Sequence, residues 1–555
     1  MERETRAAQA ATPGGSEQRT LQRTPSTLTF KPETLEELER MAGPTSYPPE
    51  LPPIGDTLLG TPTDTFPISL RQAIVSAVEQ NLSVQIARLE PAISEQEALA
   101  AQAAFDWVFF ADYRWANIDS PQATGAFAAG ANATVRESHA YTTGLRKPLT
   151  TGGAFRVFQG QTNSNDSSPG VNLNPDPSNE VQIGVELVQP LLRNFGSEVA
   201  LSEVRLAQNA ERDSIYRLKG NLNAVVTQTE RAYWDLVLSE RNLRIQQRLL
   251  ERGIETRDIL ESRRSFDVKP AEFSDAVANV QRREGNVIRA INALRQSSDR
   301  LKVLINDPEL TIGTETLLIP ADSALDQPIT YSLLDAITTA LAQRPELQRA
   351  ILQIDDSSIR LAVADNGRLP LLDFAVQAAF RGLNEGVGDA YSDALSARYV
   401  DYILSVDFEQ PIGNRASEAA FRARQLERQR ATVGYRQTVQ QIVLDVKTAM
   451  RNVDTNYKLI EQSRSSRLAA TENLRTLMVL ERTIQALTPD FLDLKFRRQE
   501  ALAVAELEEA QALVDYNTAL ADLALATGLA LDRNQIKFDV PDAGRPDPDG
   551  SSGPR

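Results

Sequence analysis

The sequence predicts a mainly α-helical protein with β-strands, in which one structural unit occurs twice. Three observations support this fold class. Similar segments recur in the same order in both halves, apolar residues keep a heptad spacing along very long segments, and two other stretches alternate apolar with polar residues. Each half of the chain is therefore expected to run from a helix through amphipathic strands into a long helical hairpin.

The composition excludes several function classes. The 555 residues contain no cysteine and one histidine, His139, which argues against disulfide scaffolds, Cys/His zinc sites and cysteine nucleophiles. A net charge of −16 is the wrong sign for a nucleic-acid binder. The sequence has no apolar run of about eighteen residues and predicts no transmembrane helix, so a spanning protein of this composition would be a β-barrel.

The two ends of the chain have low-complexity character. Residues 1–67 are rich in proline and predict an extended N-terminal arm. Met1–Thr20 is polar and contains no apolar h-region, so no secretory signal is recognisable in it. Residues 531–555 are predicted to be a C-terminal tail, and its last part, PDAGRPDPDGSSGPR (Pro541–Arg555), is predicted to be disordered.

A repeated helix begins each half. The segment Ser69–Arg88 (SLRQAIVSAVEQNLSVQIAR) aligns with Ser332–Ile351 (SLLDAITTALAQRPELQRAI) without a gap, with serine, leucine and alanine repeated at equivalent positions. The match predicts a first-repeat helix within 68–106 and a second-repeat helix within 331–369. Residues 307–330 are then a link between the two repeats.

Strand-like alternation follows each of these helices, in residues 107–190 and 370–411. VQIGVELVQP (Val181–Pro190) parallels YILSVDFEQP (Tyr402–Pro411) with the period of two typical of strands. The first stretch is about twice as long and contains TTGLRKPLTTGGAFRVFQGQ (Thr142–Gln161), the pattern of strand, tight turn and strand. The first repeat therefore has two or four strands, and the short turn favours an added hairpin, with long polar loops at Ser120–Glu137 and Thr162–Asn179. Aromatic residues that could form an interfacial belt, or be ordinary strand residues, are Tyr113, Trp115, Phe155, Phe158, Tyr399 and Tyr402.

Long helical hairpins are predicted in residues 191–306 and 412–530. Heptad rows contain Leu222, Leu236, Leu243 and Leu250 in one hairpin, Val446, Val453, Ile460 and Leu474 in the other, and Ala505, Ala512, Ala519 and Ala526 in its returning helix. The outgoing helices are each expected to be roughly 100 Å long. The returning helices are expected to begin near Ala271 and Pro489.

This order of motifs resembles the TolC family of outer-membrane efflux ducts over about Ser69–Leu531. The resemblance rests on the repeated LxxA(I/V)xxA helix start, the strand exits VELVQPLLRNFG and VDFEQPIGNR, the DRLKVLIND link and the tip DFLD. It implies duplicated helical hairpins that form an α-barrel tunnel in the periplasm, and strands of a transmembrane β-barrel in the outer membrane that oligomerisation completes. It also implies a homotrimer that is a passive exit duct of a tripartite efflux or type I secretion system, with a periplasmic adaptor (membrane fusion) protein and an inner-membrane pump as partners.

The hairpin tips contain the candidate site residues. Asp490 and Asp493 match an aspartate pair that, in the family, narrows the periplasmic entrance, and they are candidates for a cation-selective gate. Acidic residues at the start of a helix also complement the helix dipole, so the pattern leaves both roles open. The corresponding tip residues Glu272, Phe273 and Asp275, together with Phe491, are candidates for adaptor contact.

Other function classes are less well supported. The sequence contains no phosphate-binding glycine loop, metal cluster or nucleophile–base pair, so it predicts no catalytic residue, cofactor or metal site, and no enzyme. The alternative function is a periplasmic adaptor or a coiled-coil scaffold protein. Adaptors carry one hairpin, whereas this chain repeats a hairpin of similar length.

Overall fold

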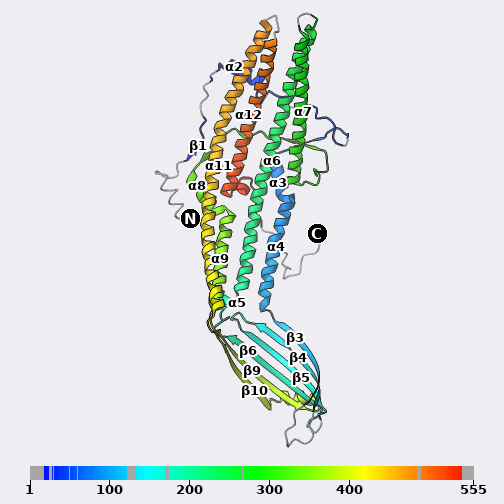
Figure 1. The fold of residues 1–555 in the computed structure, drawn as a ribbon, viewed down its shortest axis with the longest axis vertical. Helices are drawn as coiled ribbons and strands as arrows, with labels where there is room; N and C mark the ends of the chain where they lie inside the picture. Colours follow the sequence, from blue (N-terminus) through cyan, green and yellow to red (C-terminus); the bar gives the residue numbers. More distant parts are fainter. Residues whose placement is uncertain are drawn as a thin grey trace. The chain divides into compact units, whose positions relative to one another are not determined.

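A computed structural model describes residues 18–23, 28, 30–44, 46–48, 50–58, 60–121, 133–168, 174–265, 268–483 and 489–539. The chain divides into two units (Figure 1). Unit 1 contains Met1–Pro91, Ile215–Arg349 and Arg436–Asp542, and unit 2 contains Ala92–Ser214, Ala350–Tyr435 and Ala543–Arg555. The described helices include none that is both long enough and apolar enough to cross a membrane.

Unit 2 contains one six-stranded antiparallel sheet, drawn from cyan to yellow-green in Figure 1. Its strands are β3 (Val108–Pro121), β4 (Ala133–Pro148), β5 (Ala154–Asp166), β6 (Ser178–Pro190), β9 (Leu371–Asn384) and β10 (Tyr399–Glu409). The order is β10-β9-β6-β5-β4-β3, so β6 of the first repeat pairs with β9 of the second. The strands predicted separately for the two repeats therefore share one ladder.

The first repeat supplies four strands and the second supplies two, which confirms the added hairpin. The turn between β4 and β5 closes with a hydrogen bond from Leu149 N to Gly153 O of 2.8 Å, and Gly152 has a φ of 92° that a side chain would disfavour. The predicted polar loops are shorter than expected because β3 continues to Pro121 and β5 to Asp166. Of these loops, residues 122–132 and 169–173 lie outside the described residues. His139, the one histidine, lies within β4.

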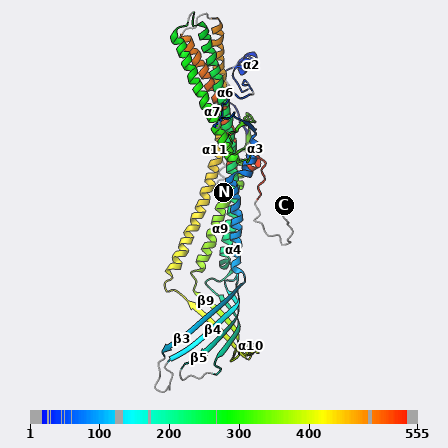
Figure 2. The same cartoon turned by 90° about the vertical axis from the view of Figure 1, so that its right-hand side faces the viewer.

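A short helix that the sequence did not predict, α10 (Val387–Leu395), connects β9 and β10 and packs on β6 and β9 (Figure 2). Ala390 and Ala394 are fully buried against Val181. A Cβ at Gly382 would collide with the carbonyl oxygen of Ala390 and lie 2.6 Å from Ala394 N. The absence of a side chain at Gly382 thus lets the helix backbone approach the sheet.

The repeated helix is broken in the same place in both halves. The pieces are α3 (Leu70–Gln80) and α4 (Leu82–Gln102) in the first repeat, and α8 (Leu333–Gln343) and α9 (Pro345–Asn366) in the second; α4 is followed by the 3₁₀ turn η1 (Ala103–Phe105). Ser69 and Ser332 occupy equivalent N-caps, with each hydroxyl accepting a hydrogen bond from the backbone N–H three residues on. The duplication therefore extends to the helix caps.

Two helical hairpins account for most of the remaining chain. Their elements are α5 (Ser197–Ala200), α6 (Ser202–Arg263), α7 (Pro270–Ile305), α11 (Arg415–Thr483), α12 (Pro489–Thr527) and α13 (Ala530–Arg533). Every residue of the three predicted heptad rows is buried, from Leu236 at 0% exposure to Leu250 at 8%. Small and branched apolar side chains at these positions allow close helix packing.

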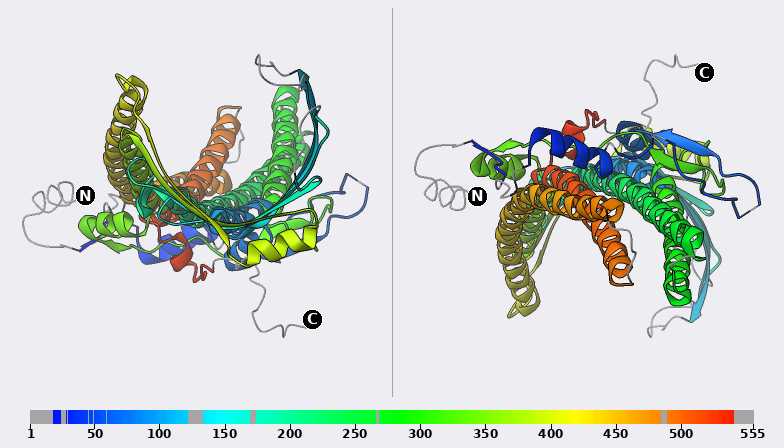
Figure 3. Two further views of the ribbon diagram at one scale, coloured as in Figure 1. Left: turned by 90° about the horizontal axis from the view of Figure 1, so that it is seen from below. Right: turned by 90° about the horizontal axis from the view of Figure 1, so that it is seen from above.

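The N-terminal arm is not simply extended. Its described part contains β1 (Arg19–Thr20), the helix α2 (Pro32–Met41) and β2 (Thr65–Ile68), and the link between the repeats contributes their partner strands β8 (Thr330–Tyr331) and β7 (Leu317–Pro320). Leu38 of α2 is fully buried, and α2, in dark blue, lies along one face of the long helices (Figure 3). The proline-rich composition did not predict the helix α2, which tertiary contacts stabilise. In the tail, Ile536 and Phe538 pack on a core cluster, and residues 540–555 lie outside the described residues.

Replacing Gly382 by alanine should release α10 from the sheet, because the added Cβ cannot fit below the Ala390 carbonyl. We expect hydrogen exchange of the amides of residues 387–395 to accelerate by about tenfold, equivalent to about 1.4 kcal/mol. Gly388→Ala is the matched control, since a Cβ there meets no atom within 4 Å. Equal exchange in both variants would show that α10 does not depend on this close approach.

Candidate functional site

The ladder of unit 2 gives the sheet one strongly apolar face. One row across the six strands contains Phe109, Leu145, Val157, Val185, Ala378 and Tyr402. Directly opposite residues of an antiparallel ladder point to the same face, so these side chains lie together. The next row on this face contains Lys147, Phe155, Leu187, Val376 and Leu404. Tyr402 is 78% exposed and Leu404 is 70% exposed. The face is a broad apolar surface. The helix α10 covers the part around Val181, and the described residues leave the part around Tyr402 and Leu404 uncovered.

The opposite face contains charged residues. Arg156 Nη1 donates to Glu186 Oε2 over 3.5 Å, and the Arg156 guanidinium lies over the ring of Phe158. Nearby, Arg381 Nη1 donates to Glu180 Oε1 over 2.7 Å and also pairs with Asp401. A face with paired charges of both signs can border water, whereas the apolar face cannot do so favourably.

Aromatic side chains gather at both ends of the apolar face. At one end, Trp107 packs edge-to-face on Phe155, and the ammonium group of Lys147 lies 5.3 Å from the centre of the Trp107 ring. At the other end, Tyr113 packs on Tyr141 with ring centres 4.8 Å apart. His139 Nδ1 and the hydroxyl of Tyr113 are within hydrogen-bond distance, 2.9 Å.

Four of the six aromatic residues predicted for a belt lie on this face: Tyr113, Trp115, Phe155 and Tyr402. Phe158 and Tyr399 lie on the charged face, because Phe158 is an odd number of residues from Phe155 and Tyr399 is opposite Arg381.

The tip of the first hairpin is built around the start of α7. Glu272 is 7% exposed, and its Oε2 accepts a hydrogen bond from Lys269 N over 3.0 Å. Glu272 therefore satisfies the first free N–H of the helix. Phe273 is half-buried, with the guanidinium of Arg264 5.0 Å from its ring centre, whereas Asp275 is exposed.

The tip of the second hairpin presents its acidic residues to solvent. Asp490 and Asp493 are both exposed in the first turns of α12, and Phe491 is half-buried. Asp493 forms an ion pair with Arg497 one turn later, and this hydrogen bond raises the pKa of Arg497. Between the hairpins, Leu260 and Ala276 pack with Leu492 and Phe496. The two tips thus share an apolar core that orients the exposed aspartates.

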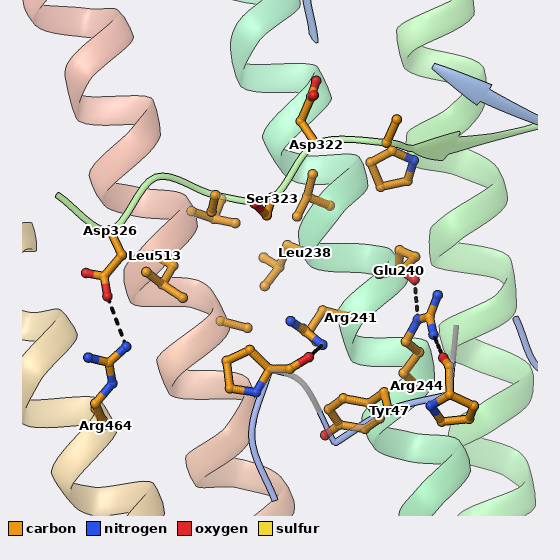
Figure 4. Close-up of a pocket in the computed structure, with 18 residues that line it drawn as sticks. Tyr47, Leu238, Glu240, Arg241, Arg244, Asp322, Ser323, Asp326, Arg464 and Leu513 are labelled. Carbon is orange, nitrogen blue, oxygen red and sulfur yellow. Dashed lines mark hydrogen bonds and ion pairs between the residues drawn. The ribbon is translucent and has the colours of Figure 1, made fainter. Parts of the chain in front are cut away.

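Unit 1 also has a pocket of about 480 Å³ beside the N-terminal arm (Figure 4). Leu238 and Leu513 form part of its apolar floor. Arg464 Nη2 donates to Asp326 Oδ2 over 3.0 Å at its edge. Among the residues that the structure describes, no group of three or more acidic or histidine side chains is arranged to hold a metal ion.

Several solved outer-membrane channels have a similar structure. CmeC of Campylobacter jejuni superposes with a TM-score of 0.60 at 14% identity, over 83% of this chain and 86% of that chain. MtrE of Neisseria gonorrhoeae superposes with a TM-score of 0.57 at 16% identity, over 83% of this chain and 89% of that chain. VceC of Vibrio cholerae superposes with a TM-score of 0.59 at 12% identity, over 83% of this chain and 96% of that chain. This chain has the TolC-like outer-membrane channel fold. No protein-family model matches the sequence, and no curated protein sequence matches it significantly.

Sequence reasoning missed two features of this TolC-like chain. The first is α10, whose Tyr391 hydroxyl accepts a hydrogen bond from Gln159 Nε2 over 2.6 Å, so that the helix covers part of the apolar face. The run between Pro370 and Pro411 is too long for two strands and a tight turn, and that length could have indicated an inserted element. The second is the attachment of the arm, for which the sequence has no local signal.

Proposed function

We propose that this chain is an outer-membrane channel, the passive exit duct of a tripartite efflux or type I secretion system. Three copies would close one transmembrane β-barrel, and their long helices would form a tunnel in the periplasm. A periplasmic adaptor protein and an inner-membrane pump would be its partners. The solved channels with this fold support the proposal, although their similarity is one of structure and not of sequence.

The observation that carries the proposal is the two-faced sheet of unit 2. Its end strands β3 and β10 each have one neighbour in the ladder, so each leaves a row of backbone N–H and C=O groups on its outer side. Such groups cannot stay unpaired in lipid, and closure by further copies is the way to pair them. Six strands from each of three copies would make a barrel of about eighteen strands with its charged face inward.

Uncovered apolar residues on the long helices also favour assembly. Ile288 of α7 is 69% exposed, and Leu426 and Val433 of α11 are 64% and 61% exposed. Leu426 and Val433 are one heptad apart and so lie on the same helix face. Neighbouring copies would cover these side chains and extend the helix packing around a tunnel.

In this duct the exposed aspartates of α12 would encircle the periplasmic entrance. Repeated by the trimer, Asp490 and Asp493 would form two rings of carboxylates that favour cations. Asp275, Phe273 and Phe491 would be the tip residues available to an adaptor. Glu272 is less suited to that contact, because it is buried and bonded to Lys269 N.

The alternative, a periplasmic adaptor or coiled-coil scaffold, would also use long helical hairpins. That function does not explain why one face of the sheet is apolar over several rows and has aromatic residues at both ends. The channel accounts for both features, so we favour it.

The assembly is tested by fractionating the membranes and comparing unheated with boiled samples on gels. We expect an outer-membrane protein that migrates as a heat-sensitive oligomer, gives cross-linked products up to the trimer, and conducts ions in planar bilayers. A monomer that alkaline carbonate extracts from membranes and that gives no conductance would contradict the proposal.

A lysine on the apolar face should block membrane insertion, whereas a lysine on the charged face should not. Leu404→Lys places a charge among residues that would face lipid, at a cost of roughly 2–4 kcal/mol near the bilayer centre. Ser405→Lys, the next residue of β10, is the matched control. The yield of heat-sensitive oligomer should fall in the first variant only. Equal yields would argue that the apolar face does not contact lipid.

Replacing both Asp490 and Asp493 by asparagine should reduce cation selectivity. The change removes both carboxylates and leaves Arg497 without the Asp493 partner, so the charge of the entrance becomes more positive. The reversal potential in a salt gradient measures this shift. Asp275→Asn is the comparison, since Asp275 is also an exposed acid, on the other tip. An unchanged potential in the double variant would leave Asp490 and Asp493 as helix-end charges only.

A further inference from the structure

The N-terminal arm contacts both helical hairpins of unit 1 through residues 32–44 and 46–48, which together are called the Pro32–Pro48 segment. Its helix α2 buries Leu38 completely, and Ala42 at its end packs with Leu474 of α11 and Leu502 of α12. Farther along, Tyr47 packs against a cluster of Ile245 and Leu249 of α6 with Ala503 of α12. One short segment thus packs on the second hairpin, at Leu474 and Leu502, and on the seam where α6 of the first hairpin meets α12 of the second.

Arg467 of α11 is bound by the arm. Its side chain is 1% exposed, so its charge depends on partners within the protein. Nη2 lies 2.9 Å and 3.0 Å from the two carboxylate oxygens of Glu39, and Nη1 donates to the carbonyl oxygen of Ala42. Nε donates to Glu509 of α12 over 2.5 Å. The arm therefore supplies two of the three groups that satisfy a buried guanidinium.

On the first hairpin, a row of arginines from α6 binds the carbonyl groups of the same segment. Arg241 Nη1 donates to Pro44 O over 3.1 Å, and Arg252 Nη2 donates to Met41 O over 3.2 Å. Arg248 donates to both the hydroxyl and the carbonyl oxygen of Ser46. Arg244 binds Pro48 O, as Figure 4 shows beside the pocket. These arginines recur every three or four residues and so form one stripe along the helix.

Tyr47 is the anchor between these contacts. Its ring centre lies 4.3 Å from the guanidinium carbon of Arg248 and 5.2 Å from that of Arg241. Glu506 of α12 lies beside it, 5% exposed, and faces Arg248 and Arg252 of α6 as well as Arg467 of α11. Burial raises the pKa of the Glu506 carboxyl, although these arginines act in the opposite direction. Charges from three helices thus converge on the point where Tyr47 docks.

We propose that Pro32–Pro48 is a clamp that holds the two hairpins together, and that its release lets their tips move apart. The hairpins also contact each other directly, for example through Arg283 of α7, whose Nη1 donates to Gln499 of α12 over 2.9 Å. The clamp adds an element from outside either hairpin. It is attached by hydrogen bonds, ion pairs and the apolar contacts of Leu38, Ala42 and Tyr47, and it can detach without unfolding a helix of either hairpin. If the chain forms the proposed duct, separation of the tips would widen its periplasmic entrance. This consequence rests on the proposed function.

The clamp is tested by measuring the distance between the hairpins in the full-length protein. The chain has no cysteine, so spin labels can be attached at Ala278→Cys on α7 and Asn473→Cys on α11, both exposed positions. The test variant combines Glu39→Gln with Tyr47→Ala. The matched control is Glu36→Gln, which changes the same charge on α2 at a residue whose side chain is 73% exposed and pairs with Arg40. Hydrogen exchange of residues 32–41 reports whether α2 has been released.

We expect the test variant to show at least tenfold faster exchange in residues 32–41 and a broader, longer distance distribution between the labels. The control should match the parent protein in both measurements. Released α2 with an unchanged distance distribution would overturn the proposal, because the hairpins would then be held without the clamp. Unchanged exchange would overturn it as well, because Glu39 and Tyr47 would not be what attaches the segment.

These outcomes are independent of the proposed function. The distances can be measured in purified protein that conducts no ions, so a chain that fails as a channel can still have a working clamp. In bilayers, the test variant should have a higher open probability than the Glu36→Gln control. If the tips separate but the open probabilities are equal, release of the clamp does not control conductance, and that part of the proposal would be wrong.

Discussion

A single antiparallel ladder decides on which side of the sheet each strand residue lies, and the rest of unit 2 depends on that register. Side chains alternate along a strand, so a slip by one residue would move the apolar set to the opposite face. The register is shared by six strands from both repeats, and β6 joins β9 across a long stretch of intervening chain. Turn geometry at Gly152 and the close approach of α10 at Gly382 help to hold it. The consequence is one broad apolar face and one face with paired charges.

The helical hairpins depend on heptad packing along their whole length. A helix longer than sixty residues has to bury a stripe of side chains along its whole length, and a sustained heptad row supplies that stripe. Leucine and branched residues fill the rows of α6 and α11, whereas alanine fills the row of α12 and lets that helix lie close to its neighbours. The apolar residues left on the outer surfaces of α7 and α11 are those that assembly would cover.

Charge is distributed unevenly in this acidic protein. In unit 1, arginines of α6 and α11 lie at the surface that the arm covers. Backbone carbonyls of the arm and the carboxylate of Glu39 accept their hydrogen bonds. Arg283, by contrast, is buried with the carbonyl of Leu249 and the amide of Gln499 as its hydrogen-bond acceptors, and burial lowers its pKa to about 10. The α6 arginines that donate to backbone carbonyls of the arm hold it in place with directional, charge-assisted hydrogen bonds.

The sequence by itself determined the features that depend on local periodicity. The duplicated helix start, the heptad rows and the alternation in Val181–Pro190 predicted the repeated helices, the buried seams and the strands, because each pattern directly reflects how a helix or strand exposes its residues. The positions of Asp490, Asp493 and Asp275 at hairpin tips followed from the same patterns. Only the tertiary structure decided which strands pair, that Phe158 and Tyr399 lie opposite the other aromatic residues, that Glu272 is buried as a helix cap, and that α2 and α10 form. These outcomes depend on partners far away in the chain, such as Arg467 for Glu39 and Val181 for Ala390, and no local pattern specifies them.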